Sequence, residues 1–564
     1  MIKKIKVLRN KFKEYNIDGY VIPKNDDYFT EYSKINRLKI ISNFSGSAGI
    51  AIILKNKNYL FTDGRYSIQS KMECGKNFKI TSFEKLINCN LFKNLTLGID
   101  PKLCTYSQIK RFFSKHNKIK CINSNLIDEI EKQKKKKSIP FFSLHKKIVG
   151  ETTNSKLNKI SRYLKKFKAD YILISAPENV AWILNIRGGD CPNSPIPNSR
   201  LLISKTKKIF LISELEKCKN LIKKKIIKFN ELININEFQK KILLLKGNKF
   251  IIDNNSCSIF FENIIKSKFE IVSREDPVYH LKSIKNEVEI NNTIKAHIKD
   301  GVALTKFIYW MKNINKKKIS EVQAQDKLEN FRKMHKSYIY PSFDTIAGAG
   351  KNGAIVHYRA KKENCRVIRN KDIFLCDSGG QYKYGTTDVT RTICFSEPKQ
   401  NIKNIFTRVL KGHIAVATSN LNKFNIGKKI DARARKFLKE KNLDYAHGTG
   451  HGVGFFLNVH EGPQSITKIN KVKIKEGMIL SNEPGYYLKN KFGIRIENLV
   501  YVKKEKNKIF FENLTMAPIE KDLINHRLLT SFEKNYLFRY HLNVYFKISK
   551  YLNIQEKKWL ASFI

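Results

Sequence analysis

The sequence predicts an α/β protein of several domains that ends in a domain of mixed α+β type. The chain has 564 residues, which is too long for one hydrophobic core. Helix-like and strand-like patterns alternate up to about residue 280. From 343 onward, short strands with glycine turns are interrupted by helices expected at 402–419 and 428–441. We therefore expect three domains, with the boundaries 1–138, 139–280 and 281–564.

The first domain is expected to be a compact α/β domain. The predicted elements are a helix over 3–15, a strand Gly19–Ile22, a hairpin of Ile50–Leu54 and Tyr59–Phe61, and a helical turn Ser67–Glu73. The loop 45–49 is rich in glycine and serine, but it precedes a strand and lacks the Lys-Ser/Thr of a phosphate loop. We interpret it and the turn 62–66 as structural. The run Lys134–Lys137 marks a linker.

The second domain repeats this alternation. Its predicted elements are a helix over 153–168, a strand Tyr171–Ser175, a helical turn around Asn179–Leu184, and strands Arg200–Ile203 and Lys208–Ile212. In the third domain, a long helix is expected to start within 283–290 and to run to about Asn313. A second helix begins after Ser320, because Gln323 three residues later completes a capping box.

Bulk composition excludes several classes of protein. The formal net charge of +58 would suit a nucleic-acid partner, but the lysines occur in every predicted element and do not interleave with aromatic residues. No apolar run approaches the roughly 20 residues of a membrane span. Lys and Arg interrupt the first 13 residues, unlike a signal peptide, and no pair among the ten cysteines has Cys-x-x-Cys spacing. We expect a cytoplasmic protein with free thiols that binds neither nucleic acid nor membranes.

Four carboxylates and one imidazole between 377 and 497 stand in distinctive surroundings. They occur in the motifs Cys-Asp-Ser-Gly-Gly, Thr-Thr-Asp-Val-Thr-Arg, Gly-Thr-Gly-His-Gly, Asn-Glu-Pro-Gly-Tyr-Tyr and Ile-Arg-Ile-Glu-Asn. We interpret the five as ligands of a two-metal hydrolytic centre: Asp377, Asp388, His451, Glu483 and Glu497.

Two predicted hairpins would bring the carboxylates together. Asp377 ends the apolar strand Ile373–Cys376, and Asp388 precedes the strand Val389–Phe395. A hairpin folded about Tyr382-Lys383 would place the two aspartates opposite each other. In the same way, strands Met478–Asn482 and Gly493–Val500, joined by a turn through 488–492, would pair Glu483 with Glu497.

Charge balance predicts two divalent ions at this cluster. Four ionised carboxylates carry a charge of −4, which two divalent ions cancel and one does not. Oxygen ligands with a single imidazole suit Mn²⁺, and Co²⁺, Fe²⁺ or Zn²⁺ are also compatible. Two such ions would hold a bridging hydroxide that attacks a polarised carbonyl or phosphoryl group, so the expected chemistry is hydrolysis. The alternative is four solvated surface acids, which their apolar strand neighbours disfavour.

Three further histidines surround the predicted ligands: His357, His447 and His460. His447 and His451 have the spacing of a helical zinc pair, but Gly448 and Gly450 between them disfavour a helix. We assign His451 to metal, and the other three to binding substrate and stabilising a tetrahedral intermediate.

The motifs resemble those of the pita-bread metallopeptidases, and most closely those of the three-domain Xaa-Pro aminopeptidases. The catalytic-domain likeness lies in 342–346, 352–358, 377–392, 447–462 and 483–497, and further likeness lies in 43–49, 62–66, 179–185 and 277–289. The resemblance implies two creatinase-like α/β domains followed by a pita-bread domain. It also implies a homodimer and an enzyme that releases an N-terminal residue from short peptides with proline second.

Residue roles follow from the same resemblance. Asp377, Asp388, His451, Glu483 and Glu497 would bind two metals, commonly manganese. The implied catalytic residues are Glu483, which helps to activate the hydroxide, and the three histidines at 357, 447 and 460. The histidines and Arg495 are the expected substrate contacts. A prolyl nitrogen carries no hydrogen, so a site that accepts the ring can select for it.

Two alternatives remain open. An Xaa-Pro dipeptidase (prolidase) shares the five ligands, although three domains favour the aminopeptidase. A non-catalytic pita-bread module that binds peptides, histones or nucleic acid would be expected to lack ligands, and none is missing from this sequence. A creatinase-like hydrolase has the same fold but uses other ligands, so the complete metal set of this sequence disfavours that third possibility.

Overall fold

The computed structural model describes residues 1–564 except 88–91, 114–116, 133–137, 315–317 and 364. The predicted linker Lys134–Lys137 lies outside the described residues. The chain divides into two compact units, Met1–Val278 and Tyr279–Ile564. The boundary at 138 inside the first unit stays a prediction.

The first unit contains two six-stranded sheets of the same topology. The first has the order β4-β3-β2-β1-β5-β6, and the second has the order β12-β11-β10-β8-β13-β14. In each, one inner strand, β2 or β10, is antiparallel to both of its neighbours, and all other neighbouring strands are parallel. The same α/β pattern is therefore used twice, although the sequence shows no evident internal repeat.

The bounds of the first half agree with the predicted elements to within two residues. The strands are β1 (Gly19–Pro23), β2 (Ile50–Leu54), β3 (Asn58–Thr62), β4 (Lys79–Ser82), β5 (Thr96–Ile99) and β6 (Lys118–Cys121). The helices are α1 (Ile2–Glu14), α2 (Arg37–Ser42), α3 (Ser67–Cys74), α4 (Phe83–Ile87), α5 (Tyr106–Phe112) and α6 (Leu126–Ile130). Helix α1 packs on the sheet through Ile5, Leu8 and Phe12, which have the spacing of one helical face.

The second half agrees with prediction equally well. Its strands are β7 (Phe142–Ser143), β8 (Tyr171–Ile174), β9 (Ile186–Arg187), β10 (Arg200–Ser204), β11 (Ile209–Ile212), β12 (Leu232–Ile233), β13 (Lys249–Ile252) and β14 (Glu270–Ser273). Its helices are α7 (Lys146–Val149), α8 (Thr153–Lys166), α9 (Pro177–Leu184), α10 (Leu215–Lys223), α11 (Phe238–Leu244), α12 (Ile259–Lys266) and α13 (Val278–Ser283), the last of which crosses the unit boundary.

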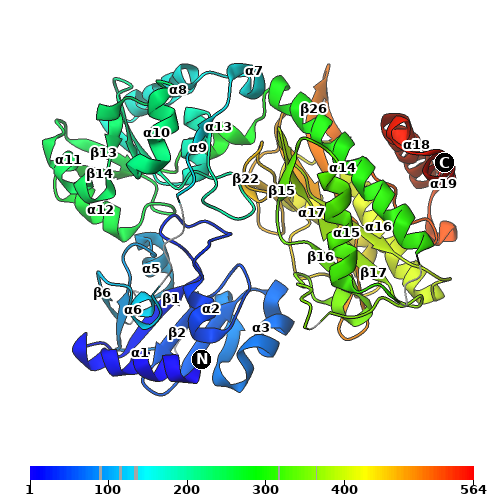
Figure 1. The fold of residues 1–564 in the computed structure, drawn as a ribbon, viewed down its shortest axis with the longest axis horizontal. Helices are drawn as coiled ribbons and strands as arrows, with labels where there is room; N and C mark the ends of the chain where they lie inside the picture. Colours follow the sequence, from blue (N-terminus) through cyan, green and yellow to red (C-terminus); the bar gives the residue numbers. More distant parts are fainter. Residues whose placement is uncertain (88–91, 114–116, 133–137, 315–317, 364) are drawn as a thin grey trace. The chain divides into compact units, whose positions relative to one another are not determined.

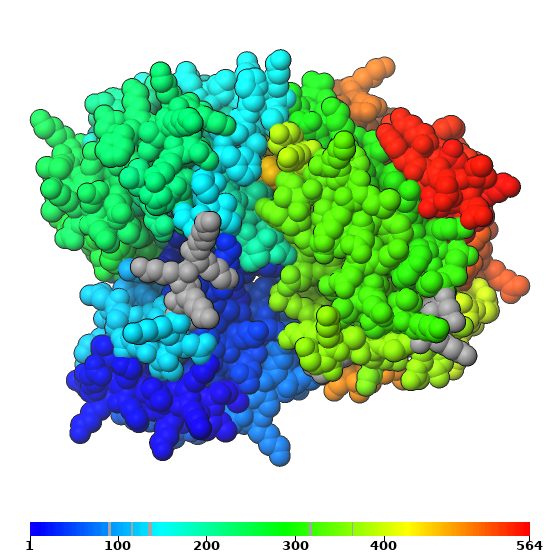
Figure 2. All heavy atoms as spheres, viewed as in Figure 1, coloured from blue at the N-terminus to red at the C-terminus, as the bar shows by residue number. Residues whose placement is uncertain are grey.

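The second unit combines long helices with short strands. Its helices are α14 (Glu287–Asn313), α15 (Glu321–Lys333), α16 (Gln400–Ala417), α17 (Gly427–Lys439), α18 (Ser531–Ile548) and α19 (Ile554–Ala561). Helix α14 packs against α15, and α16 packs against α17 (Figure 1). Helices α18 and α19 contact α14 and form part of the surface, coloured red in Figure 2.

The strands of this unit form four small sheets. They are β15 (Tyr338–Pro341), β16 (Ile346–Ala349), β17 (Phe374–Ser378), β18 (Gly380–Tyr382), β19 (Gly385–Thr386), β20 (Val389–Ile393), β21 (Gly450–Gly452), β22 (Glu461–Ile466), β23 (Ile479–Asn482), β24 (Gly485–Leu488), β25 (Phe492–Arg495), β26 (Asn498–Glu505) and β27 (Lys508–Asn513). The largest sheet has the order β22-β21-β23-β26-β27, and the two others with three strands are β15-β18-β19 and β16-β17-β20.

Two helix starts show what the local sequence determines. The capping box of Ser320 and Gln323 is present at α15, as predicted. The long helix begins at Glu287, within the predicted range 283–290, and ends at the predicted Asn313. Asn286 caps it and forms a box with Glu289, and residues 278–283 make the separate short helix α13.

No helix in the described part of the chain has the length and apolar character needed to span a bilayer. The nine cysteines within the described residues are free thiols, and seven of them are buried.

Candidate metal centre

The first acidic hairpin carries Asp377 and Asp388, but its register differs from the predicted one. Strand β17 pairs with β20 so that Asp377 faces Thr390. The predicted tip lay one residue too early, because Tyr382 pairs with Gly385 and leaves Lys383-Tyr384 as the turn. Moving a tip by one residue shifts the opposing residue by two, which preserves the face. Asp377 and Asp388 therefore still point to one side of the hairpin, staggered rather than opposed.

The second acidic hairpin carries Glu483 and Glu497 in the predicted register. Asn482 pairs with Asn498 at the end of β23, and Gly485 pairs with Arg495 at the start of β24. The β23–β26 and β24–β25 pairs have the same register. Glu483 and Glu497, which lie between these two strand pairs, therefore stand opposite each other. Each glutamate thus occupies a position where the main chain leaves one sheet and enters the next.

His451 brings the two hairpins together. It lies on β21, and its Nε2 is 3.4 Å from Asp388 Oδ2 and 3.5 Å from Glu483 Oε1. One ligand atom each from Asp388, His451 and Glu497 lies within 4.8 Å of the other two. The intervening glycines do not form a helix between His447 and His451, as predicted. The cluster therefore joins residues separated by more than 100 positions in the sequence.

Asp377 has one oxygen that the protein leaves unsatisfied. Its Oδ2 accepts a hydrogen bond of 2.5 Å from Arg495 Nη2, whereas its Oδ1 is buried without a hydrogen-bond partner in the described structure. A buried carboxylate oxygen without a partner is costly. A cation at this position would supply the missing interaction.

The charges of the cluster are strongly coupled. Burial raises the pKa of Glu497 well above its usual value, and the neighbouring carboxylates of Asp388 and Glu483 raise it further. Burial also raises the pKa of Asp377; Arg495 opposes this effect, and Asp388 adds a smaller contribution that raises the pKa. Burial disfavours the charged form of His451, but the adjacent carboxylates outweigh it and raise the pKa of this imidazole to about 9. Neighbouring carboxylates thus disfavour one another's ionised forms, and a cation among them would relieve this repulsion.

The donor set fits divalent cations. Carboxylate oxygens with one imidazole suit Mn²⁺ and similar ions. Ligand atoms of Asp388, His451 and Glu497 lie close enough together to hold an ion, while Asp377 has an unpartnered oxygen within the described residues. A second group that could hold an ion comprises Cys394, Glu520 and Asp522, but there Lys312 already pairs with both carboxylates.

Two of the predicted substrate histidines lie beside the cluster. His447 Nδ1 is 3.9 Å from Glu483 Oε2, and the ring of His460 stands at 89° to the ring of His451 with centroids 4.4 Å apart. Burial lowers the pKa of His447 to about 4, so this imidazole is neutral at physiological pH. The contact of both histidines with substrate stays a prediction.

His357 follows the short helix Gly350–Ala354 on a segment held by a buried carboxylate. Glu321 accepts hydrogen bonds from the Tyr358 hydroxyl at 2.8 Å and from the side chain of Asn352. These bonds fix the chain on both sides of His357. Its contact with substrate stays a prediction.

Arg495 has a role that the sequence did not indicate. Its Nη2 donates to Asp377, its Nη1 to the Tyr487 hydroxyl at 2.5 Å, and its Nε to the Thr390 hydroxyl at 3.0 Å. The side chain is buried, and each of its three nitrogens already binds a protein group. This geometry makes Arg495 a support for the carboxylates, and its predicted substrate contact stays a prediction.

Several supporting residues were missed in the sequence. The Thr390 hydroxyl donates to Glu497 Oε2 at 2.8 Å, and Ser481 Oγ donates to Glu483 Oε1 at 3.1 Å. Tyr487 lies in the Glu-Pro-Gly-Tyr-Tyr motif that marked Glu483, which was the available signal for it. The hydroxyl of Tyr487 is 2.9 Å from His447 Nε2.

Arg391 is a further support, although the motif Thr-Thr-Asp-Val-Thr-Arg that contains it gave it no role. It is buried, and its guanidinium donates to the Glu497 carbonyl oxygen at 2.6 Å, the Pro518 carbonyl oxygen at 2.8 Å and the Tyr540 hydroxyl at 3.0 Å. It thereby ties the main chain at a predicted ligand to helix α18.

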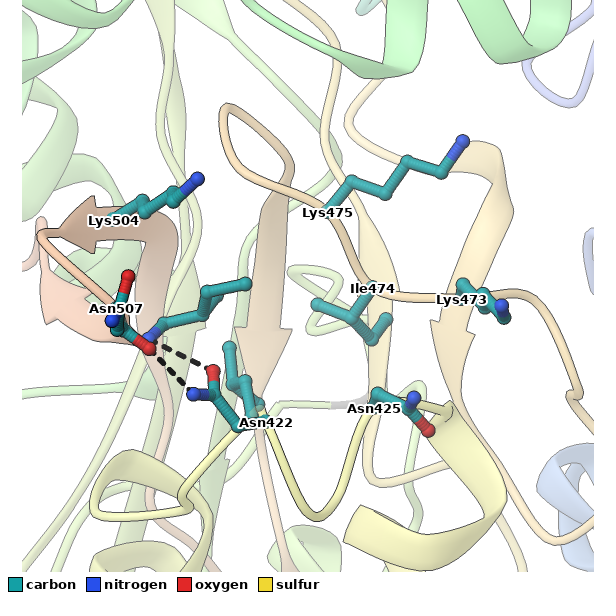
Figure 3. Close-up of a pocket in the computed structure, with 9 residues that line it drawn as sticks. Asn422, Asn425, Lys473, Ile474, Lys475, Lys504 and Asn507 are labelled. Atoms are coloured by element: carbon teal, nitrogen blue, oxygen red, sulfur yellow. Dashed lines mark hydrogen bonds between the residues drawn. The ribbon is translucent and has the colours of Figure 1, made fainter.

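A surface depression elsewhere on the second unit is chemically different (Figure 3). An Asn422–Asn507 hydrogen bond of 2.6 Å crosses one side of it. Its lining contains no acid and no histidine; the residues are Leu421, Asn422, Asn425, Lys473, Ile474, Lys475, Lys504, Asn507 and Ile509. It is therefore separate from the metal centre.

Comparison with known proteins accounts for the whole chain. Residues 291–504 match metallopeptidase family M24, and residues 508–562 match the C-terminal region of that family. Residues 4–130 and 131–289 each match the creatinase/prolidase N-terminal domain. A probable Xaa-Pro aminopeptidase P of Laccaria bicolor is 36% identical over 589 residues, covering 98% of this chain and 91% of that protein. The chain belongs to the Xaa-Pro aminopeptidase P family. It is thus a hydrolase of the metallo-aminopeptidase class.

Further members of the family show the same full-length similarity. Xaa-Pro aminopeptidase 1 of Dictyostelium discoideum is 36% identical over 605 residues, covering 99% of this chain and 96% of its own. The solved X-prolyl aminopeptidase of Caenorhabditis elegans has a TM-score of 0.91 and 28% identity, and covers 100% of this chain and 99% of its own. That protein is described as a cytosolic enzyme with a di-nuclear active site. The predicted fold, two creatinase-like domains followed by a pita-bread domain, is confirmed.

Proposed function

We propose that this aminopeptidase hydrolyses the bond between an N-terminal residue and a following proline in short peptides, and that it uses two divalent ions, most suitably Mn²⁺. The observation that carries the proposal is full-length similarity to Xaa-Pro aminopeptidases, combined with the convergence of Asp388, His451 and Glu497, with Glu483 3.5 Å from His451. Asp377, Asp388, His451, Glu483 and Glu497 would hold the ions.

When bound, the ions would lower the pKa of a coordinated water and polarise the scissile carbonyl group. The imidazoles and the guanidinium around Glu483 offset the effect of burial and lower the pKa of this carboxyl below its usual value. Glu483 is therefore ionised at neutral pH, and it can accept a proton from the attacking water. It would then deliver that proton to the departing prolyl nitrogen, as a general base followed by a general acid.

His447 is held as a neutral imidazole of one tautomer. Arg495 donates to the Tyr487 hydroxyl, so that hydroxyl must donate onward to His447 Nε2. His447 Nδ1 then carries the proton, which it donates to the Gly448 carbonyl oxygen at 2.7 Å. These hydrogen bonds fix the ring of His447 beside Glu483. His460 is therefore the better candidate for donating a hydrogen bond to the developing oxyanion.

The main alternative is an Xaa-Pro dipeptidase. The solved prolidase of Pyrococcus horikoshii has 26% identity and a TM-score of 0.53, and it covers 65% of this chain. An X-Pro aminopeptidase of Thermotoga maritima covers a similar 64%, so domain number alone does not separate the two activities. Full-length similarity to the Caenorhabditis elegans enzyme supports the aminopeptidase.

A peptide panel tests the proposal. Metal-stripped protein is loaded separately with Mn²⁺, Co²⁺, Fe²⁺ or Zn²⁺ and given Ala-Pro-Ala, Ala-Ala-Ala and Ala-Pro. We expect release of alanine from Ala-Pro-Ala only, fastest with Mn²⁺. Cleavage of Ala-Pro with Ala-Pro-Ala left intact would establish the dipeptidase instead. No hydrolysis with any metal would favour a binding module.

We also propose a cytoplasmic homodimer. The buried free thiols suit a reducing compartment. Large apolar side chains remain exposed on α18 and just beyond it, among them Phe532 at 64% and Phe546 at 70%. Such side chains favour an interface between subunits. Light scattering coupled to size-exclusion chromatography should give about twice the chain mass of 65.7 kDa, and a monomer would contradict the proposal.

A further inference from the structure

Two lysines and one glutamate are buried together next to His460. Glu461 follows His460 in the chain and begins β22. Lys282 Nζ lies 3.0 Å from Glu461 Oε2, and Lys285 Nζ binds Glu461 Oε1. Each of the three side chains is at most 2% exposed. The ion pairs are therefore almost completely removed from water.

Such a cluster is an expensive way to stabilise a fold. Removing charged groups from water costs several kcal/mol per ion, and apolar packing is often as stable as a buried ion pair. Two ammonium groups also share one carboxylate here. Burial lowers the pKa of Lys285, and the charge of Lys282 lowers it further, whereas Glu461 and Glu289 oppose this effect. The three charged side chains therefore contribute more to fixing the local geometry than to stabilising the fold.

The geometry that they fix is that of the two adjacent imidazoles. Glu461 pairs with Gly452, the residue after His451, at an irregularity in the β21–β22 register. His451 and His460 are thus attached directly to this pair, and their rings stand 4.4 Å apart. On the lysine side, Lys285 N donates to the Gly477 carbonyl oxygen at 2.9 Å, which anchors the segment before α14 to the same sheet.

We propose that Lys282, Lys285 and Glu461 are positioning residues that set the place of His460 relative to His451. This inference rests on the proposed function, in which His460 contacts the substrate. Lys282 and Lys285 hold the side chain of Glu461 at the start of β22. Because Glu461 follows His460 in the chain, fixing Glu461 also fixes the position of His460. None of the three residues is assigned to contact substrate or metal.

Charge count predicts an asymmetric response to substitution. Glu461→Gln removes the carboxylate that pairs with both buried ammonium groups, so β22 should shift and kcat should fall about 10- to 100-fold, the usual range for groups that orient a site. Lys282→Met leaves a one-to-one pair and should lower kcat less than tenfold. Adding Lys282→Met to Glu461→Gln removes one unpaired charge, and we expect it to recover part of the loss.

A matched control is available on α14. Lys312 Nζ pairs with the buried carboxylate of Glu520 at 2.6 Å, away from the metal centre but in the same unit. Lys312 also pairs with Asp522 at 3.0 Å, so Lys312→Met likewise removes one lysine from a cluster of three charged groups, and here it leaves two carboxylates. We expect it to lower the thermal unfolding temperature as Lys282→Met does, with kcat unchanged.

The experiment uses the full chain and separates stability, metal binding and turnover. Thermal unfolding of the metal-free protein, Mn²⁺ binding by calorimetry, and kcat and KM on Ala-Pro-Ala are measured for each variant. We expect Glu461→Gln to retain Mn²⁺ affinity and KM while kcat falls, because His460 is proposed to act in the transition state. In a His460→Ala background, Glu461→Gln should lower kcat no further.

Two results would overturn the inference. The first is that Glu461→Gln and Lys282→Met have the same kcat as Lys312→Met when the three variants are equally stable. The other is an additive loss in the His460→Ala background. Wild-type protein that leaves Ala-Pro-Ala intact would instead refute the proposed function, and the wild-type measurement alone decides that point.

Discussion

The two acidic hairpins reach the same result with different geometry. In the second, the same offset on both sides of the break puts Glu483 directly opposite Glu497. In the first, Asp377 pairs with Thr390, and Asp388 lies two residues before Thr390 in the sequence. Since side chains alternate across a strand, a two-residue stagger keeps both carboxylates on one face. The carboxylates come together because they lie on the same face of the hairpin, and they need not be directly opposite each other.

The hairpins also brace each other. Arg495 of the second hairpin binds Asp377 of the first, while Thr390 of the first binds Glu497 of the second. Arg495 Nε donates to the same Thr390 hydroxyl, which closes the brace. Neither pair of acids is held by its own hairpin alone, so a change in one hairpin should be felt by the ligands of the other.

Removing a ligand should have the largest effect. We expect Asp388→Ala to lower kcat/KM by more than about 1000-fold, because the staggered hairpin would lose a carboxylate needed to hold the ions. The metal-free fold should survive, since one source of repulsion on Glu497 disappears. Peptide hydrolysis and circular dichroism test this. Manganese-dependent turnover at the wild-type level would refute the ligand assignment.

Cutting the brace should have an intermediate effect. Thr390→Val keeps the shape of the side chain but removes the hydroxyl bound to Glu497 and Arg495, and Mn²⁺ affinity should fall about 10- to 100-fold. Thr392→Val is the control, because that hydroxyl bonds only to the main chain of Arg495, at 2.9 and 3.0 Å. It should cost about 1 kcal/mol of stability without changing Mn²⁺ affinity. Equal Mn²⁺ affinities in the two variants, measured by calorimetry, would contradict the brace.

Each hairpin carries a tyrosine near its tip, and the two should respond differently. Tyr487→Phe removes the hydroxyl between Arg495 and His447, so we expect kcat/KM to fall about tenfold, the equivalent of one hydrogen bond. Tyr382 instead donates to Asp300 Oδ1 at 2.8 Å, within a buried pair with Arg332. Tyr382→Phe should lower thermal stability with little kinetic effect. A kinetic loss in Tyr382→Phe as large as in Tyr487→Phe would show that the hairpins are not distinguished in this way.

A buried acid in the first unit that is not a predicted metal ligand provides a further comparison. Burial raises the pKa of Asp276 to about 7. Because this value exceeds the unfolded one, Asp276 stabilises the protonated fold, and that contribution is lost as pH rises from about 4 through 7. Asp276→Asn should therefore be more stable than wild type at pH 8 and equal to it near pH 4, with kcat unchanged. The amide can pair with Asn179, whose Oδ1 is unpartnered within the described residues.

Thermal unfolding across this pH range tests the sign. Asp18 is the opposing control, since its bond to Lys55 and the Thr96 N–H hold its pKa below the usual value. Its contribution is present above the unfolded pKa and lost as pH falls. Asp18→Asn should thus lose stability at neutral pH, whereas Asp276→Asn gains it. The same sign for both variants would contradict the assigned shifts.

The sequence predicts elements better than their registers. Periodicity located α16 and α17 to within two residues, and motif surroundings identified acids that the structure gathers around His451. The tip of the first hairpin was misplaced by one residue, because Lys383 and Tyr384 carry no turn signal of the Asn-Gly kind. The start of α14 depended on one cap, Asn286, that the helical pattern around it obscured.

Supporting residues were the least predictable part of the site. Arg495 stood inside a motif, but nothing in one sequence states whether an arginine faces a peptide or Asp377. Thr390 and Arg391 act through partners more than 100 positions away. Such bonds are set by tertiary packing, and local patterns carry no record of them.

The bond between Arg391 and Tyr540 has a consequence for the order in which the protein is made. These residues are 149 positions apart, and the same guanidinium holds the main chain at Glu497. A ribosome adds residues from the N-terminus at about 5–20 per second, so all five predicted ligands are synthesised several seconds before helix α18 supplies the tyrosine. The nascent chain therefore contains all five predicted ligands before the hydrogen bond between Arg391 and Tyr540 can form.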